Sequence, residues 1–276
     1  MAERHSGFHK KTLSDERSSL RAFLFCPAGF FTYDQAADDS SGPCPVHAED
    51  HVAMNIYRTC NGPCPYLPTG QWITEVFYAG CIPGRSYEDL LENGWRRSGC
   101  CFYRNTCPDC SNCIPIRVDV HRFHPNRSQK RTLSHNQDIT VERIPAMFHT
   151  QDFALYKTYC LFRHNQSPSE DDYSHFLVQS PLMTHIMRYW AGSTLLAAAW
   201  IDMLPMSISS VYCAYDPAYM RRSPGTLSIL LQIELCRELQ KSWLYLGFYV
   251  QASPRMRYKK NFQPCQALMN QQWRSL

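Results

Sequence analysis

Eight of the fourteen cysteines of this 276-residue chain stand between Cys60 and Cys113, at spacings that could bind a metal. Cys60 and Cys64 flank an Asn-Gly-Pro turn, and Cys107, Cys110 and Cys113 follow one another at a three-residue step. Four thiolates bind zinc in a tetrahedron, and an iron–sulfur cluster also takes four. The alternative is a disulfide knot, so the redox compartment decides between them.

The N-terminal sequence indicates a reducing compartment. Residues Met1 to Leu20 are charged and polar, with no apolar run that could direct secretion, so we expect a cytoplasmic protein with free thiols. The cysteine followed by proline that would complete a ferredoxin run is absent after Cys113. We therefore predict a zinc or iron–sulfur site that combines Cys60 and Cys64 with two of Cys107, Cys110 and Cys113. The adjacent Cys100 and Cys101 could supply one ligand.

Composition indicates a folded protein of two modest domains. Apolar residues make up 44% and aromatic residues 13% of the chain, enough to fill real cores. The longest nearly apolar stretch, Leu195 to Met206, is interrupted by Asp202 and Pro205 and is too short to cross a bilayer. We therefore predict no membrane span.

The positive charge is unevenly distributed, although the net charge is only +4. Five Arg or Lys residues lie between Arg117 and Arg131, and a second basic cluster runs from Arg255 to Lys260. A single cluster is usually a solvated face. Two clusters that include aromatic residues favour contact with nucleic-acid phosphates.

The first half of the chain divides into two parts. Residues 1–50 are rich in Gly, Pro, Ser and acids and predict a partly flexible arm with one short strand near Phe23 to Tyr33. Residues 51–145 form the predicted cysteine-rich domain. Within it we expect a short helix with Ser86 as N-cap and Gly94 just past its end, followed by a turn at Trp95 to Gly99. Ile114 to Val120 alternates like a strand.

The sequence pattern of residues 146–276 predicts a second, α/β domain. The expected elements are a helix at Asp152–His164, strands at Thr184–Trp190, Thr194–Asp202 and Ser207–Tyr215, a helix from Ser223-Pro224 to Gln240, and a strand at Trp243–Val250. This order is that of an acetyltransferase-like core, in which the acyl donor enters where neighbouring strands splay. The predicted fold class is α+β, a mixed acetyltransferase-like (GNAT-type) sheet with a cysteine-rich, metal-binding or cluster-binding N-terminal domain.

Specific residues from about Cys60 to Lys259 give the chain a family resemblance. It resembles the arginyl-tRNA protein transferases and their bacterial relatives that transfer leucine to acidic N-termini. The matching segments are Cys64-Pro-Tyr-Leu-Pro68, Tyr87 with Gly94-Trp-Arg-Arg-Ser-Gly99, Cys110 with Ile116-Arg117, Phe123 with Asn126-Arg-Ser-Gln-Lys130, Ser180-Pro-Leu182, Ile201-Asp-Met-Leu-Pro205, Ser209-Ser-Val-Tyr212 with Tyr215-Asp-Pro217, and Tyr245-Leu-Gly-Phe-Tyr249 with Met256-Arg-Tyr-Lys259.

The resemblance implies an aminoacyltransferase that acts in N-degron protein degradation. Its partners would be aminoacyl-tRNA and proteins beginning with Asp or Glu, and we expect a monomer. The family's C-terminal half has the acetyltransferase-like fold, and its N-terminal cysteines bind zinc or an iron–sulfur cluster. Ser223-Pro224-Gly225 departs from the family's usual Ser-Leu-Gly, and Thr69 stands where the bacterial branch usually has Gly, so the donor amino acid, arginine or leucine, stays open.

The reaction itself needs little from the enzyme. The donor is an activated ester, and an α-amino group with a pKa near 7.7 to 8.0 is partly neutral in the cell. Transfer therefore requires no cofactor and no covalent intermediate, but alignment and a proton relay. We predict Asp202 as proton acceptor or amine anchor, with Tyr215 and Asp216 nearby. The alternative is that Asp202 is a turn-capping carboxylate.

Basic and aromatic residues are the predicted substrate ligands. Arg96, Arg97 and Arg117 could bind the acidic first residue of the acceptor, unless they form ordinary ion pairs with Glu88, Asp89 or Glu92. The remaining predicted ligands are Arg127, Lys130, Arg257 and Lys259 for tRNA phosphates, and Tyr258 and Trp95 for stacking on the terminal adenine.

Two other functions fit parts of the sequence. A non-catalytic, zinc-dependent nucleic-acid-binding protein would use the basic clusters alone. An acetyl-CoA-dependent acetyltransferase would need a Gly-rich pyrophosphate loop, of which Arg221 to Gly225 offers only a fragment.

Overall fold

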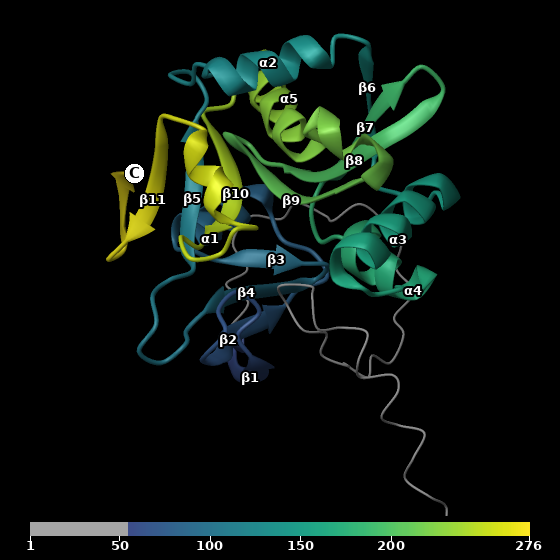
Figure 1. Cartoon of the computed structure of the whole chain (residues 1–276). Helices are drawn as coiled ribbons and strands as arrows, with labels where there is room; N and C mark the ends of the chain where they lie inside the picture. The colour runs from purple at the N-terminus through teal and green to yellow at the C-terminus, as the bar shows by residue number, and fades with distance from the viewer. Residues whose placement is uncertain (1–54) are drawn as a thin grey trace, which may run out of the picture.

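The computed structural model describes residues 55–276, and the predicted N-terminal arm with its strand near Phe23 to Tyr33 lies outside them. Two sheets frame the described part of the chain (Figure 1). The smaller one is antiparallel, in the order β1-β2-β4-β3, and consists of β1 (Tyr57–Pro63), β2 (Gln71–Tyr78), β3 (Arg96–Ser98) and β4 (Cys101–Asn105). Helix α1 (Gly84–Glu92) connects β2 to β3.

The larger sheet has the order β12-β11-β5-β10-β9-β8-β7-β6. Its strands are β5 (Ile114–Asp119), β6 (Ile139–Pro145), β7 (Thr184–Ala191), β8 (Thr194–Met203), β9 (Ser207–Tyr215), β10 (Trp243–Tyr249), β11 (Cys265–Met269) and β12 (Gln272–Ser275). Neighbours are antiparallel except β9 and β10, which run parallel. A parallel pair needs a crossover connection, and helix α5 (Pro224–Glu238) provides it.

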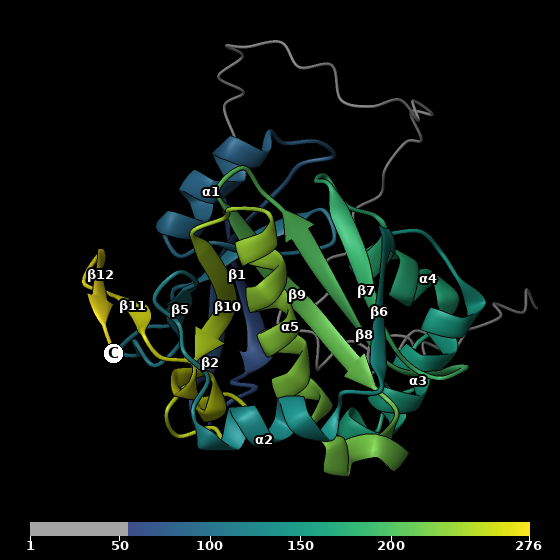
Figure 2. The same cartoon turned by 90° about the horizontal axis from the view of Figure 1, so that it is seen from above.

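Helices cover both faces of the larger sheet (Figures 1 and 2). Helices α2 (Arg127–His135) and α5 lie on one face, and α3 (Thr150–His164), α4 (Glu170–Tyr173) and the π-helix η2 (Ser174–Val178) on the other. The remaining helices are the 3-10 turns η3 (Pro217–Arg222) and η4 (Arg257–Asn261). No helix among residues 55–276 is long and apolar enough to span a membrane.

Strand β8 explains why the sheet is covered on both sides. Ala199 and Ile201 belong to the core under α5, whereas Ala198 and Trp200 belong to the core under α3. Successive side chains of a strand point to opposite faces, so a continuous apolar run must be buried on both. The mixed α+β class expected from the sequence is confirmed.

Most elements predicted for the second half are confirmed within one or two residues. Strands β7, β8, β9 and β10 and helices α3 and α5 stand where their patterns placed them. The two predicted N-caps were wrong, whereas Gly94 lies just past the end of α1 as expected. Helix α1 begins at Gly84, so Ser86 lies inside it, and the side chain of Ser223 caps nothing because its backbone is left-handed at φ 55°. Burial of Tyr87 and Leu91, rather than a cap, holds α1 in place.

The larger sheet includes strands from both sides of the domain boundary expected near residue 145. Strands β5 and β6 come from the cysteine-rich part, yet they pair with β10 and β7 of the second half. The cysteine-rich segment is therefore attached to the core of the second half through two strands.

Candidate functional site

Strands β9 and β10 separate soon after they begin. Their parallel pairing covers three positions, Trp243 with Ser207, Leu244 with Ile208 and Tyr245 with Ser209, and continues no further although both strands do. On its other side β10 has an irregularity between Tyr245 and Phe248. Gly247 lies in it with φ +79°, a conformation that favours glycine. The separation leaves main-chain carbonyls without a ladder partner.

Two cationic side chains donate to these carbonyls. Arg96, from β3, donates from Nη2 to the Ser210 carbonyl at 2.9 Å. Lys259, from η4, donates from Nζ to the Phe248 carbonyl at 3.0 Å. A guanidinium group from β3 and an ammonium group from η4 thus contact the two strands that border the gap.

Both cations lie beside Gly247. A Cβ atom at this position would lie 3.6 Å from both Arg96 Nη2 and Lys259 Nζ. Burial, and next the positive charge of Arg96, lower the pKa of Lys259 to about 7. The environment therefore disfavours a second positive charge unless an anion joins it.

Asp202 and Arg97 form a buried ion pair next to this gap. Arg97 Nε donates to Asp202 Oδ2 at 2.7 Å, Nη2 donates to Oδ1, and the two side chains are 1% and 0% exposed. Thr184 Oγ1 donates to the same carboxylate at 2.7 Å. A carboxylate so enclosed by donors is well suited to positioning β3, and its predicted role as proton acceptor stays a prediction.

The structure does not bring Tyr215 and Asp216 to Asp202. Asp202 pairs with Ser209, whereas Tyr215 pairs with Ala197 at the opposite end of β9, about 20 Å away along the strand. Asp216 caps η3 by accepting from the Ala218 amide at 2.9 Å. The three predicted catalytic residues therefore do not form one cluster.

Two predicted substrate ligands lie in packed interiors. Trp95 is 5% exposed and stacks edge to face on Phe77, so it offers no open face to an adenine. Arg117 lies between Trp243 and Trp273, at 3.8 and 4.3 Å from their ring centroids, and pairs with Glu92. The ion pairs weighed as alternatives are thus present for Arg117 with Glu92, and for Arg97 with the unforeseen partner Asp202.

The two basic clusters of the sequence lie on neighbouring elements. Gln129 of α2 donates to the Asn261 carbonyl of η4 at 3.0 Å. The predicted phosphate ligands Arg127 and Lys130 are exposed on α2, and Arg257 is exposed on η4. Tyr258, next to Arg257, is 36% exposed. The fold therefore joins both clusters into one surface. The Lys259 side chain points away from this surface, toward the Phe248 carbonyl in the gap.

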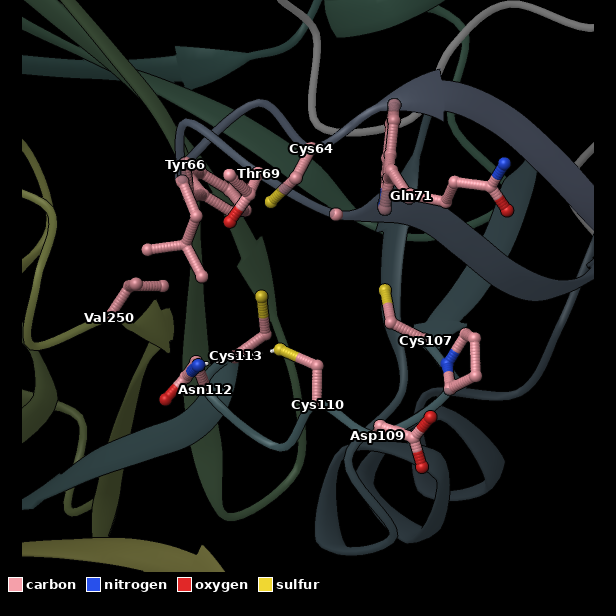
Figure 3. Close-up of a pocket in the computed structure, with 14 residues that line it drawn as sticks. Cys64, Tyr66, Thr69, Gln71, Cys107, Asp109, Cys110, Asn112, Cys113 and Val250 are labelled. Carbon is pink, nitrogen blue, oxygen red and sulfur yellow. Dashed lines mark hydrogen bonds between the residues drawn. The ribbon is translucent and has the colours of Figure 1, made fainter.

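Four cysteines line one hollow of about 280 Å³: Cys64, Cys107, Cys110 and Cys113 (Figure 3). Cys64 follows β1, and the other three come from the loop between β4 and β5. All four are free thiols. Burial, and next the neighbouring Cys107, Cys64 and Cys110, raise the pKa of Cys113 to about 12.

Cys60 does not belong to this group. It lies within β1, paired with Ile73, and is exposed, away from the lining of the hollow. The structure thus places Cys60 apart from the other four predicted ligands, because CxxxC spacing does not show which way a strand turns its side chains. Within the described part of the chain, no three His, Cys, Asp or Glu side chains stand close enough to hold a metal ion as they are.

Sequence reasoning missed Gly247 and Ser210, which form the walls of the gap. A signal for Gly247 was present, since an isolated glycine inside an apolar strand indicates a bulge or a close approach. Helix α2 was also missed, although Asn126 and Gln129 form a capping box that the sequence displays. Ser210 contributes only its carbonyl, which no residue type reveals.

Both halves of the chain match a known family. The N-terminal pattern of the arginine-tRNA-protein transferases matches residues 62–131, and their C-terminal pattern matches residues 151–269. The aspartate/glutamate leucyltransferase of Shewanella sp. (strain MR-4) is 39% identical over 215 residues, which cover 76% of this chain and 90% of that protein. That of Pseudomonas fluorescens (strain Pf0-1) is 37% identical over 226 residues, covering 80% and 96%.

Solved structures align more loosely. FemX gives a TM-score of 0.41 at 7% identity, covering 70% of this chain and 79% of its own. L-PGS from Bacillus licheniformis gives 0.38 at 14% identity, covering 63% and 52%.

Proposed function

Since this chain belongs to the arginine-tRNA-protein transferase family, it is an aminoacyl-tRNA protein transferase, and we propose that it transfers leucine to proteins that begin with Asp or Glu. The choice of leucine as the donor and of Asp or Glu as the acceptor rests on the likeness to the aspartate/glutamate leucyltransferases. This likeness extends over at least nine-tenths of those proteins. We assign the reaction to the cytoplasm, where charged tRNA and reduced thiols coexist.

The active site of this proposal is the gap between β9 and β10. In an acetyltransferase-like core the acyl donor enters where two parallel strands separate, and the three-position ladder supports that architecture for the larger sheet. We therefore place the aminoacyl ester of the tRNA beside Ser210 and Gly247. The acceptor's amino group approaches the same gap.

The chemistry is the aminolysis of an ester. The neutral amine nitrogen attacks the ester carbonyl carbon, a peptide bond forms, and the bond to the ribose oxygen breaks. One proton passes from the amine to the departing ribose oxygen. The enzyme accelerates this step by holding the amine and the ester together and by favouring the charge of the tetrahedral intermediate.

The tRNA would be held by the joined basic surface of α2 and η4. Arg127, Lys130 and Arg257 are exposed there and can each neutralise a phosphate, while Tyr258 can stack on an unpaired base. This surface borders the gap because η4 also carries Lys259.

We also propose that Cys64, Cys107, Cys110 and Cys113 hold zinc or an iron–sulfur cluster. The donor set suits such a group in kind, since four thiols line one hollow, and they would have to move closer together to bind it. Burial and the neighbouring cysteines raise the pKa of Cys113, so a bound cation would favour the thiolate form of that residue. The bound group would supply folding energy to the loop between β4 and β5. It takes no part in the transfer.

The test uses the purified full chain, a peptide beginning with Asp, and tRNA charged with radiolabelled leucine or arginine. We expect label to reach the peptide from leucyl-tRNA. Two matched controls define the background: the same peptide beginning with Asn, and one with an acetylated N-terminus. Label from neither donor contradicts the proposal, and label from arginyl-tRNA alone contradicts the choice of leucine.

A further inference from the structure

Arg96 and Lys259 are two adjacent cations without a counter-ion among residues 55–276. Neither forms an ion pair with a described carboxylate, although most other buried arginines do: Arg97 has Asp202, Arg117 has Glu92 and Arg188 has Asp152. Their contacts with the Ser210 and Phe248 carbonyls use one donor each. Several N–H donors of each cation remain available.

The spacing of the two groups suits one carboxylate. Both Arg96 Nη2 and Lys259 Nζ lie 3.6 Å from the point that a Cβ of residue 247 would occupy. A carboxylate whose two oxygens accept at about 2.7–2.9 Å can bridge nitrogens placed in this way. Gly247 leaves that space free of a side chain, which gives the residue a function beyond its backbone angle.

Electrostatics favour an anionic ligand here. The charged group that acts on Lys259 is Arg96 of β3, with the Tyr87 hydroxyl of α1 beyond it. On its own element the flanking Arg257 and Lys260 are also basic. A bound carboxylate would stabilise the protonated ammonium and relieve the repulsion between the two cations.

The location distinguishes an acceptor carboxylate from a tRNA phosphate. Arg96 is 7% exposed and reaches the gap from inside the protein, whereas backbone phosphates can reach the exposed α2 and η4 surface. The side-chain carboxylate of an N-terminal Asp or Glu lies within a few bonds of the reacting amine. An anion site beside the proposed ester position therefore aligns amine and ester.

From these contacts we propose that Arg96 and Lys259 bind the side-chain carboxylate of the acceptor's first residue and determine the selectivity for Asp and Glu. The proposal rests on the proposed function. The planar guanidinium fixes the orientation, and the flexible lysine stem accommodates both acid lengths. Arg97 and Arg117, already paired, have no part in this recognition.

The test compares the wild type with Lys259→Gln in steady-state transfer from leucyl-tRNA to peptides that begin with Asp or Asn. Losing one charge-assisted hydrogen bond should raise KM for the Asp peptide about 10- to 100-fold and reduce the preference for Asp over Asn by a similar factor. The KM for leucyl-tRNA should stay within about twofold. Lys241→Gln is the matched control, because Lys241 also donates to main-chain carbonyls, those of Leu204 and Pro205, but lies outside the gap.

Three outcomes would overturn the proposal. They are an unchanged preference for Asp in Lys259→Gln, a rise confined to the KM for leucyl-tRNA, and a fall in kcat at unchanged acceptor KM. A thermal unfolding curve for each variant at pH 6 shows whether a change in kinetics comes from misfolding. Lys259→Arg retains the charge and should recover part of the preference for Asp over Asn.

A binding measurement keeps the inference independent of the donor. Binding of the Asp and Asn peptides to the full chain without tRNA should show the same preference and the same loss in Lys259→Gln. If the wild type transfers no amino acid but binds the Asp peptide selectively, the proposed function fails and the carboxylate site stands. Equal binding of both peptides would remove the site.

Discussion

The Arg97 guanidinium and the Asp202 carboxylate join the two sheets of this protein through a buried ion pair. Arg97 belongs to β3 of the smaller sheet and Asp202 to β8 of the larger one. Arg97 also donates to the Gly99 carbonyl at 3.1 Å, which links the pair to the turn after β3. Because Arg96 is the preceding residue, the pair determines where the Arg96 side chain enters the gap.

Removing one partner of this pair should destabilise the protein strongly. We expect Asp202→Asn and Arg97→Met each to lower the free energy of unfolding by about 3–5 kcal/mol, because a buried charge is left alone. The double variant should lose less than the sum. Urea unfolding measures all three, and Asp138→Asn is the control, since it breaks an exposed pair with Arg222 and should leave the unfolding midpoint nearly unchanged. If Asp202→Asn lost activity at full stability, Asp202 would be the proton acceptor after all.

Gly99 is another position at which a substitution should lower the free energy of unfolding. It has φ +56°, and a Cβ there would stand 2.1 Å from the main-chain oxygen of His175. Gly192 has a similar φ of +60° with nothing within 4 Å of its Cβ position. Gly192→Ala should therefore cost about 1–2 kcal/mol of unfolding free energy from strain alone, and Gly99→Ala at least about 2 kcal/mol more. Equal costs would show that the η2 backbone moves aside.

The second half of the fold was predictable because its strands are buried on both faces or alternate cleanly. Strand β8 reads as an unbroken apolar run, and its neighbours begin and end at turn residues. The pairing of Arg97 with Asp202 was not predictable, since the two residues are 105 positions apart and each had nearer charged candidates. Long-range side-chain contacts depend on sheet order, which local patterns do not contain.

The cysteine group was also only partly predictable, because its members come from segments far apart in the sequence. The three-residue step of Cys107, Cys110 and Cys113 placed three thiols on one loop, and only the lining of the hollow shows that Cys64 faces them while Cys60 does not. The separation of β9 from β10 was expected from the order of elements, but the two cations inside it come from segments more than 150 positions apart.

The metal proposal makes a prediction that separates neighbouring cysteines. Cys64→Ser should remove most of the bound zinc or iron from protein purified without oxygen, because one of four thiolate ligands is lost. Cys60→Ser should retain the metal, since Cys60 is exposed and lies outside the hollow. Elemental analysis of both variants checks this, and equal metal loss would return Cys60 to the ligand set.

The joined basic surface should control tRNA affinity and its dependence on salt. The double variant Lys130→Ala, Arg257→Ala should raise the KM for leucyl-tRNA and reduce the slope of log affinity against log salt by about 1.4–1.8. The acceptor KM should not change, because these side chains are exposed outside the gap. Arg274→Ala on β12 is the control, and a slope unaltered in the double variant would place the tRNA elsewhere.

Acceptor binding should weaken as pH rises above the pKa of Lys259, which burial and Arg96 lower to about 7. The acceptor carboxylate prefers the protonated ammonium, so binding is complete below that pKa and is lost above it, by up to about tenfold per pH unit. In Lys259→Arg the cation stays charged, so the weakening between pH 7 and 8.5 should disappear. Isothermal calorimetry without tRNA measures the affinity for the Asp peptide at each pH, with no contribution from the transfer reaction. Because the peptide's own groups titrate equally with both proteins, the difference in affinity between wild type and Lys259→Arg reports on Lys259 alone. Parallel pH profiles for the two proteins would exclude Lys259 from the carboxylate site.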